Sequence, residues 1–414
     1  MLVKVIIASI ITGHIYYCYR YAFQINDENT SPTYSGTPLI LQAARYAIDM
    51  SIYAIAILCS FSKAEAVRNK GSVYFMHLLA WLVIGCILIF KATQSGLELD
   101  VIASVVKSLY VVPIGMLVLL VPPTEKSLKT IIKWIVLYPF FYHTAYNFVQ
   151  VVLYLTTGRL TALAYEGGFI RFGGGWDDPN GFGLYCVMVI TWSLVNIGRN
   201  KNIAFYGTIA TLGLVQLLGT ISYSSFFAFA CAGVMLIILV KSAIVRSIAL
   251  CGIILLLALA SFKYAAILDA YDSKLESANL HVEELKYLDS FFASDTLELL
   301  FGKSGVVTSE SEFIYIFTNF GFVGLMVVLS FFIWFLNRIR GAYLIRRRQG
   351  SDNFFETCLV FGTITVVAVL AGSLGIPSLT VYPVNLFFWI LIFTMIQASA
   401  AKGGLEKMDA FSSS

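Results

Sequence analysis

Residues 180–197 read NGFGLYCVMVITWSLVNI and contain no charged side chain. A run of this length is close to the ~20 apolar residues with which an α-helix crosses the hydrocarbon core of a bilayer. Comparable runs recur along the 414 residues, of which 58% are hydrophobic and 13% charged, whereas soluble domains carry roughly 25% charged residues. The sequence therefore predicts an all-α polytopic membrane protein that forms a single integral membrane domain over residues 1–414. About twelve spans are expected, near 3–22, 39–61, 72–91, 101–121, 131–155, 180–197, 203–219, 225–240, 247–267, 313–336, 354–372 and 381–400.

The lysines and arginines predict the orientation of the chain. If the N-terminus is inside, most of the 28 basic residues fall in cytoplasmic ends and loops, as the positive-inside rule requires. Both termini are therefore expected in the cytoplasm. The same placement accounts for the net charge of +4, so no nucleic-acid partner is expected.

Two polar segments, 157–179 and 268–312, are then expected to form the larger outer loops. The first ends in the sharply turned stretch FIRFGGGWDDPNGF, residues 169–182. The second contains HVEELKYLDSFF, residues 281–292, whose apolar stripe predicts an amphipathic helix against the outer membrane face.

The first of these stretches has strong turn chemistry. Pro179 fixes φ, and Asn180 tolerates φ > 0. Asp178 is expected to cap the following helix, with Pro179 at its first position. Gly173 begins a run of three glycines, which would let the backbone approach a ligand closely. Capping and turn formation explain Asp178, Pro179 and Asn180, but they do not explain Arg171 beside the glycines.

Two basic residues lie inside predicted helices near their outer ends. Arg45 precedes Asp49 by one helical turn, so the two side chains can pair on one face. Lys107 lies about two turns into the fourth predicted span. Charges at membrane depth are costly and often functional, so Arg45 and Lys107 are candidates to contact an anionic lipid headgroup. Structural pairing or snorkelling explains them equally well.

The seven cysteines all lie in or beside apolar runs and form no Cys-x-x-Cys pair. They are expected to be small core residues rather than a disulfide framework or a metal site. The adjacent acidic residues Asp177 and Asp178 are too sparse to predict a cation site. No metal and no cofactor is expected.

Two segments resemble the superfamily of bacterial O-antigen polymerases and O-antigen ligases, which are membrane glycosyltransferases. The first signature segment is GRLTALAYEGGFIRFGGGWDDPNGFG, residues 158–183. The second signature segment is LELLFGKSG followed by SESEFIYIFTNFGFVGLMVVL, within residues 297–329. The first is similar to an outer-loop signature in which an arginine and glycines precede an Asp-Pro-Asn turn into a helix. Its matching residues here are Arg171, Gly173, Asp178, Pro179, Asn180 and Gly183.

The resemblance implies a GT-C-like fold in the bacterial plasma membrane and a metal-independent, inverting glycan transfer on its outer face. The donor would be an undecaprenyl-pyrophosphate-linked oligosaccharide. A chain-length regulator protein and membrane lipids would be the other partners.

Two departures favour a polymerase of O-antigen repeat units over a ligase that transfers glycan to lipid A-core. Many members carry a Ser-Arg pair where this chain has Tyr223 and Ser224. Ligases typically place a histidine where Glu310 stands.

The departing lipid pyrophosphate needs positive charge, and a guanidinium matches phosphate oxygens with two parallel donors. Arg171 and Arg159 on the first outer loop are the predicted pyrophosphate ligands, with Arg45 and Lys107 on the same side.

The incoming sugar hydroxyl needs a carboxylate that orients or deprotonates it. Glu310 and Glu312, at the mouth of the tenth span, are the predicted catalytic residues, and Asp177 and Asp178 are second choices. From another class of protein, a polysaccharide flippase or transporter remains an alternative. Transporters place polar sites near the bilayer midplane, whereas the polar residues here crowd the outer side.

Overall fold

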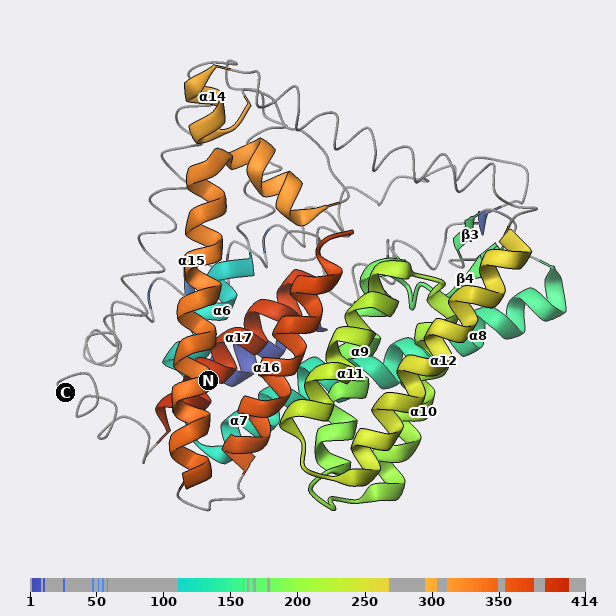
Figure 1. The fold of residues 1–414 in the computed structure, drawn as a ribbon, viewed down its shortest axis with the longest axis horizontal. Helices are drawn as coiled ribbons and strands as arrows, with labels where there is room; N and C mark the ends of the chain where they lie inside the picture. Colours follow the sequence, from blue (N-terminus) through green and yellow to red (C-terminus); the bar gives the residue numbers. More distant parts are fainter. Residues whose placement is uncertain are drawn as a thin grey trace.

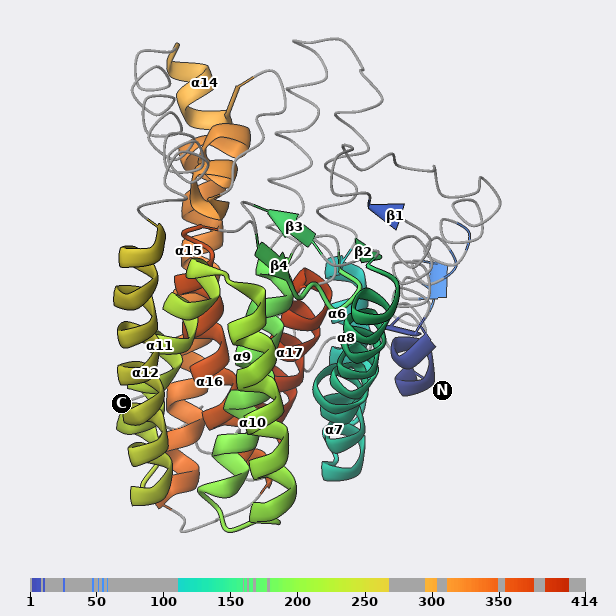
Figure 2. The same ribbon diagram turned by 90° about the vertical axis from the view of Figure 1, so that its right-hand side faces the viewer.

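A computed structural model of the protein describes residues 2–8, 10–11, 25–26, 47, 51, 54–55, 58, 111–158, 160–161, 164–166, 169–176, 179–267, 295–303, 311–348, 354–375 and 384–401. These residues are predominantly helical, as the sequence predicts (Figure 1). Two short antiparallel strand pairs, which were not predicted from the sequence, lie in the upper half of Figure 2. They are β1 (Ile25–Asn26) with β2 (Leu160–Thr161), and β3 (Ala164–Glu166) with β4 (Phe169–Arg171).

From residue 179 onward the helices match the predicted spans, apart from the tenth, 313–336, whose helix extends further. Before that point, the fifth predicted span, 131–155, lies within one continuous helical segment, 125–157, that contains a π-helical turn. The elements are α6 (Val111–Leu120), α7 (Glu125–Ile132), the π-helix η1 (Lys133–Leu137), α8 (Tyr138–Thr157), α9 (Pro179–Ile197), α10 (Ile203–Thr220), α11 (Tyr223–Leu239), α12 (Ala243–Ile267), α14 (Thr296–Phe301), α15 (Glu312–Arg348), α16 (Phe354–Gly372) and α17 (Val384–Ala400).

Four of these helices are long and apolar enough to cross a membrane: α9, α10, α15 and α16. Three more, α11, the first part of α12 and α17, are apolar but shorter. The described chain is therefore that of a membrane protein with several candidate spans. The predicted spans before residue 101 and the amphipathic stretch 281–292 lie largely outside the described residues, so a total of about twelve spans stays a prediction.

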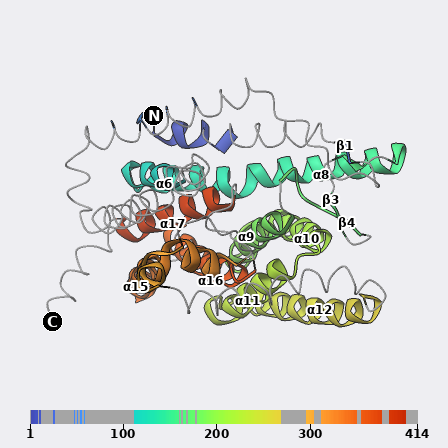
Figure 3. The same ribbon diagram turned by 90° about the horizontal axis from the view of Figure 1, so that it is seen from above.

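Helix α9 lies at the centre of the bundle. All its residues from Gly181 to Ile197 are buried, because α10, α11, α16 and α17 pack around it. Figure 3 shows the arrangement from above: α6 and α8 form one side, α17, α9 and α10 the middle, and α15, α16, α11 and α12 the other side. A helix surrounded in this way needs apolar residues on every face, which explains the composition of 180–197.

The outer helices carry large apolar side chains on their exposed faces. Val215 on α10 is 54% exposed, Phe227 on α11 is 51% exposed and Ile254 on α12 is 57% exposed. Apolar surface spread over neighbouring helices would be unfavourable in water, whereas it matches the hydrocarbon of a bilayer. These faces are the ones expected to contact lipid.

The bundle has two distinct ends, seen at the top and bottom of Figure 2. The upper end is formed by the starts of α9, α11 and α15 and by the ends of α10 and α16. The lower end is formed by the opposite termini of the same helices. The two signature segments both lead into helices at the upper end.

Helix α15 continues past the predicted span 313–336 to Arg348, so the basic residues that follow that span are also helical. Ile339 and Ala342 within this extension are fully buried. Arg346 donates from Nη2 to the carbonyl oxygens of Ala398 and Ala401, each at 3.1 Å. The last carbonyl groups of a helix have no hydrogen-bond donor within that helix. Arg346 supplies a donor to the carbonyls at the end of α17, and these bonds fix the extension of α15 against it.

The two parts of the second signature segment pack against each other at a kink in α15. Gly302 follows α14 with φ 90°, and Gly321 breaks α15 with φ 64° and ψ −168°. The backbone N–H of Lys303 donates to the carbonyl of Thr318 at 2.9 Å. A Cβ on Gly321 would lie 2.3 Å from the carbonyl carbon of Leu300. Only glycine fits this close approach between backbones.

Replacing Gly321 with alanine is therefore expected to lower the thermal unfolding midpoint of the detergent-solubilised protein, with a loss of about 1–3 kcal/mol in stability. Gly341→Ala is the matched control, because it lies on the same helix and a Cβ there meets no atom within 4 Å. That variant should be neutral or slightly stabilising, by up to ~1 kcal/mol. Equal midpoints for the two variants would contradict the interpretation of the kink.

Candidate functional site

The glycine-rich turn after β4 is buried in the upper end of the bundle. Gly174 and Gly175 have φ of 63° and 81°, and the N–H of Trp176 closes the turn by donating to the carbonyl of Gly173 at 2.8 Å. A Cβ on Gly174 would lie 2.6 Å from the ring of Phe182. The glycines thus have a structural function: they allow a left-handed turn against the first turn of α9.

Polar side chains from α8 and α10 hold this turn from the other side. The Asn147 Oδ1 atom accepts from the N–H of Gly174 at 2.9 Å, and its Nδ2 donates to Oε1 of Gln216 at 2.8 Å. Gln216 in turn donates to the hydroxyl of Thr144 at 2.6 Å. Asn147 and Gln216 are both about 4% exposed, so these bonds satisfy polar groups that would otherwise be costly to bury.

His143 and Trp176 complete the same network. The indole Nε1 of Trp176 donates to Nε2 of His143 at 2.9 Å, and Nδ1 of the same ring lies 2.5 Å from the carbonyl oxygen of Gly174. Since Nε2 accepts, Nδ1 carries the proton and donates, which fixes one neutral tautomer. The Trp176 ring also stacks on Phe387 of α17, with centroids 6.0 Å apart and planes at 16°.

This network was not predicted, although the sequence contains a signal for it. His143, Asn147 and Gln150 recur every three or four residues in an otherwise apolar span, and all three side chains are buried. Such spacing places polar groups on one helical face, and a polar face at membrane depth predicts a buried partner.

Removing the indole donor should weaken the network. Trp176→Phe is expected to destabilise the protein by about 1–2 kcal/mol more than Trp192→Phe, because it leaves the buried Nε2 of His143 without its donor. Trp192 is a matched control: it is 5% exposed against 4% for Trp176, and its Nε1 has no hydrogen-bond partner among the described residues. Thermal unfolding of both variants measures the difference, and a smaller loss for Trp176→Phe would contradict the role assigned to the bond.

Arg171 is the last residue of β4 and is only 7% exposed. Its Nε donates to the carbonyl oxygen of Thr220 at the end of α10 at 2.8 Å, and its Nη2 donates to Oδ1 of Asn180 at 2.6 Å. The guanidinium therefore connects three chain segments at the upper end.

The turn between α10 and α11 lies directly beside this arginine. Ser222 caps α11 by accepting from the N–H of Ser225 at 3.2 Å. Ser225 donates to the carbonyl of Asn180 at 2.8 Å. Ser224 connects this turn to a different helix: its hydroxyl donates to the carbonyl of Gly375, just after α16, at 3.3 Å.

Glu312 lies on the other side of the same α16 terminus. It is the first residue of α15, it is fully buried, and its N–H donates to the carbonyl of Ser373 at 2.9 Å. A continuous series of contacts thus runs from Arg171 through Asn180 and the serines of α11 to the end of α16 and on to Glu312. The two signature segments are therefore linked, through α11 and the end of α16, at one end of the bundle.

The structure brings together some of the predicted site residues. Arg171, Gly173, Pro179, Asn180 and Glu312 all lie at the upper end. Pro179 is the first residue of α9, as predicted. The remaining predicted residues lie outside the described part of the chain: Arg45, Lys107, Arg159, Asp177, Asp178 and Glu310.

Within the described ranges, no group of three or more His, Cys, Asp or Glu side chains is placed to hold a metal ion. The cysteines at 186, 231, 251 and 358 are free thiols. Comparison with models of known protein families and with curated proteins finds no match for this chain.

Proposed function

We propose that this protein is a polysaccharide polymerase that joins lipid-linked repeat units, of the O-antigen type, at the outer face of the bacterial plasma membrane. The observation that supports the proposal is that hydrogen bonds through α11 and the end of α16 link the two signature segments at the upper end. A buried arginine and a buried carboxylate, 141 residues apart in sequence, are linked there by hydrogen-bonded helix termini. An arginine and a carboxylate are the two kinds of group that glycan transfer from a pyrophosphate requires.

In the proposed reaction, a sugar hydroxyl of the acceptor attacks the anomeric carbon of the donor glycan. The new glycosidic C–O bond forms as the C–O bond to the pyrophosphate breaks, and the electron pair of that bond leaves on the lipid pyrophosphate. The hydroxyl proton passes to a carboxylate, for which Glu312 and Glu310 are the candidates. Arg171 stabilises the charge on the leaving group, with Arg159, Arg45 and Lys107 as further candidates.

The burial of Glu312 supports its proposed role as the base. An ionised carboxylate is costly to remove from water, and such groups are concentrated at functional sites. Glu312 is fully buried at the first turn of α15, where a helix N-terminus favours negative charge. The polar residues of the upper end also argue against a transporter, whose binding site is expected near the bilayer midplane.

Deletion of the gene, followed by gel analysis of surface glycans, tests the proposal. Loss of long chains with retention of a single capped repeat unit identifies a polymerase. Complete absence of glycan on lipid A-core identifies a ligase instead. Unchanged glycans, with purified protein inactive on lipid-linked repeat units, would rule out both activities.

The proposed sidedness makes a separate prediction. Both termini are expected in the cytoplasm and the upper end outside, so single cysteines introduced at Thr161 and Ser277 in a cysteine-free background should react with a membrane-impermeant maleimide in intact spheroplasts. A cysteine at Lys126, beside the start of α7 at the lower end, is the control and should react only after permeabilisation. The reverse pattern would invert the topology.

A further inference from the structure

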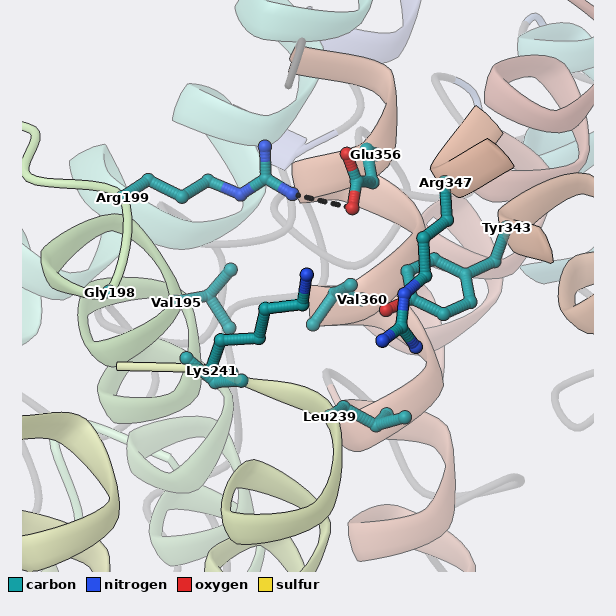
Figure 4. Close-up of a pocket in the computed structure, with 10 residues that line it drawn as sticks. Val195, Gly198, Arg199, Leu239, Lys241, Tyr343, Arg347, Glu356 and Val360 are labelled. Carbon is teal, nitrogen blue, oxygen red and sulfur yellow. Dashed lines mark ion pairs between the residues drawn. The ribbon is translucent and has the colours of Figure 1, made fainter. Parts of the chain in front are cut away.

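A second polar site lies at the lower end of the bundle, opposite the candidate active site. A pocket of about 310 Å³ opens between the connection after α9, the connection after α11, the last turns of α15 and the first turn of α16. Three basic side chains and one acidic side chain line it: Arg199, Lys241, Arg347 and Glu356 (Figure 4).

The charges in this pocket are not balanced. Arg199 Nη2 and Glu356 Oε1 lie 3.3 Å apart and form an ion pair whose side chains are 13% and 15% exposed. Among the described residues, no acidic side chain lies within ion-pair distance of Lys241 or Arg347. Figure 4 shows Lys241 extending toward the space that these side chains surround. The pocket therefore has an excess of positive charge, and anions are the ligands that match it.

Part of the wall of the pocket is apolar. Leu239, Val195 and Val360 line it together with the charged residues. Ile238 and Ile244 flank the lining residues 239–241 in sequence and are 63% and 59% exposed, so both helices that lead to this connection carry exposed apolar side chains. A ligand that fits both features has an anionic head and apolar chains.

We propose that this pocket binds the phosphodiester headgroup of an anionic phospholipid, with the acyl chains lying along α11 and α12. Basic pockets between transmembrane helices at the positively charged side of a membrane protein are suited to such headgroups. The proposal does not depend on the glycosyltransferase activity, because the pocket lies at the other end of the bundle. Its chemistry is shared by free phosphate, so the test separates the two sources.

The experiment measures thermal unfolding of the purified full-length protein in a neutral detergent. Short-chain phosphatidylglycerol is titrated, with phosphatidylcholine of the same chain length and inorganic phosphate in parallel. Phosphatidylglycerol is expected to raise the midpoint at concentrations where the other two do not, because a ligand that binds the native state stabilises it.

The variant Lys241→Gln/Arg347→Gln should need a roughly 30-fold higher phosphatidylglycerol concentration for the same rise, since each basic contact near an anionic headgroup contributes independently. Lys126→Gln/Arg340→Gln is the matched control, because both residues are exposed and basic and neither lines the pocket. The control should respond like the unchanged protein.

Three results would overturn the proposal. The first is an equal rise with phosphatidylcholine, which would mean that the chains bind without the headgroup. The second is an equal rise with inorganic phosphate, which would assign the pocket to a free anion. The third is an unchanged titration of the Lys241→Gln/Arg347→Gln protein, which would place the lipid elsewhere.

Discussion

Replacing Arg171 by lysine is expected to remove nearly all glycan polymer from cells that still contain the protein in their membranes. Losing one donor that stabilises developing negative charge typically lowers a rate by about 10²–10³. Lysine does not rescue the loss, because its ammonium supplies a point charge instead of a planar fork of donors. Glycan ladders and quantitative membrane immunoblots of the same cells measure both quantities.

Arg171 also has a structural function, which the experiment must separate from pyrophosphate binding. Its Nε donates to Thr220 and its Nη2 to Asn180, so a substitution also disturbs one buried and one partly buried hydrogen bond. A hydrogen bond in which a charged group takes part contributes about 1.5–3 kcal/mol to stability. A fall in polymer could therefore follow from a weakened upper end of the bundle alone.

Asn180→Ala is the control that separates the two functions. It removes the acceptor for Nη2 while the guanidinium remains, so the loss of stability should approach that of Arg171→Lys. If Arg171 binds the pyrophosphate, Asn180→Ala should retain most of the polymer, within about a tenfold reduction in rate. Equal losses of polymer and of protein in the two variants would give Arg171 a structural role only.

The fold was predictable where a local apolar run alone determines the bounds of a helix. The predicted span 354–372 coincides with α16, and 180–197 differs from α9 by one residue, because continuous apolar runs of this length have few other stable arrangements. The extension of α15 to Arg348 was not predictable in the same way. It depends on hydrogen bonds from Arg346 to the end of α17, which no local pattern reveals.

The candidate site was predictable only in part, for a related reason. The glycine turn and the helix start at Pro179 were predictable from the sequence, since both depend on the backbone preferences of neighbouring residues. The partners of the turn are distant in sequence: Gln216 lies 69 residues from Asn147. Tertiary packing alone brings them together, so the burial of Arg171 and the network around His143 needed the structure.

Replacing Glu312 by glutamine is expected to abolish polymerisation while the folded protein is retained. The amide has nearly the same shape as the carboxylate but cannot accept a proton as a base, and loss of general-base catalysis typically costs about 10²–10⁴ in rate. Glu312 is fully buried, and glutamine keeps the size and shape of its side chain, so the thermal unfolding midpoint should change little. A large loss of activity without a loss of stability is the combination that a catalytic or acceptor-binding carboxylate predicts.

A capping role for Glu312 predicts the opposite combination. A carboxylate in the first turn of a helix stabilises it by only about 0.3–1 kcal/mol through the helix dipole, so under that role Glu312→Gln would lower the unfolding midpoint slightly and leave chain length near normal. Glu356→Gln is a matched control, because Glu356 lies in the first turn of α16 at the other end of the bundle and pairs with Arg199. It should show that capping-type pattern. Polymer of normal length from both variants would remove Glu312 from the reaction and leave Glu310 as the candidate base.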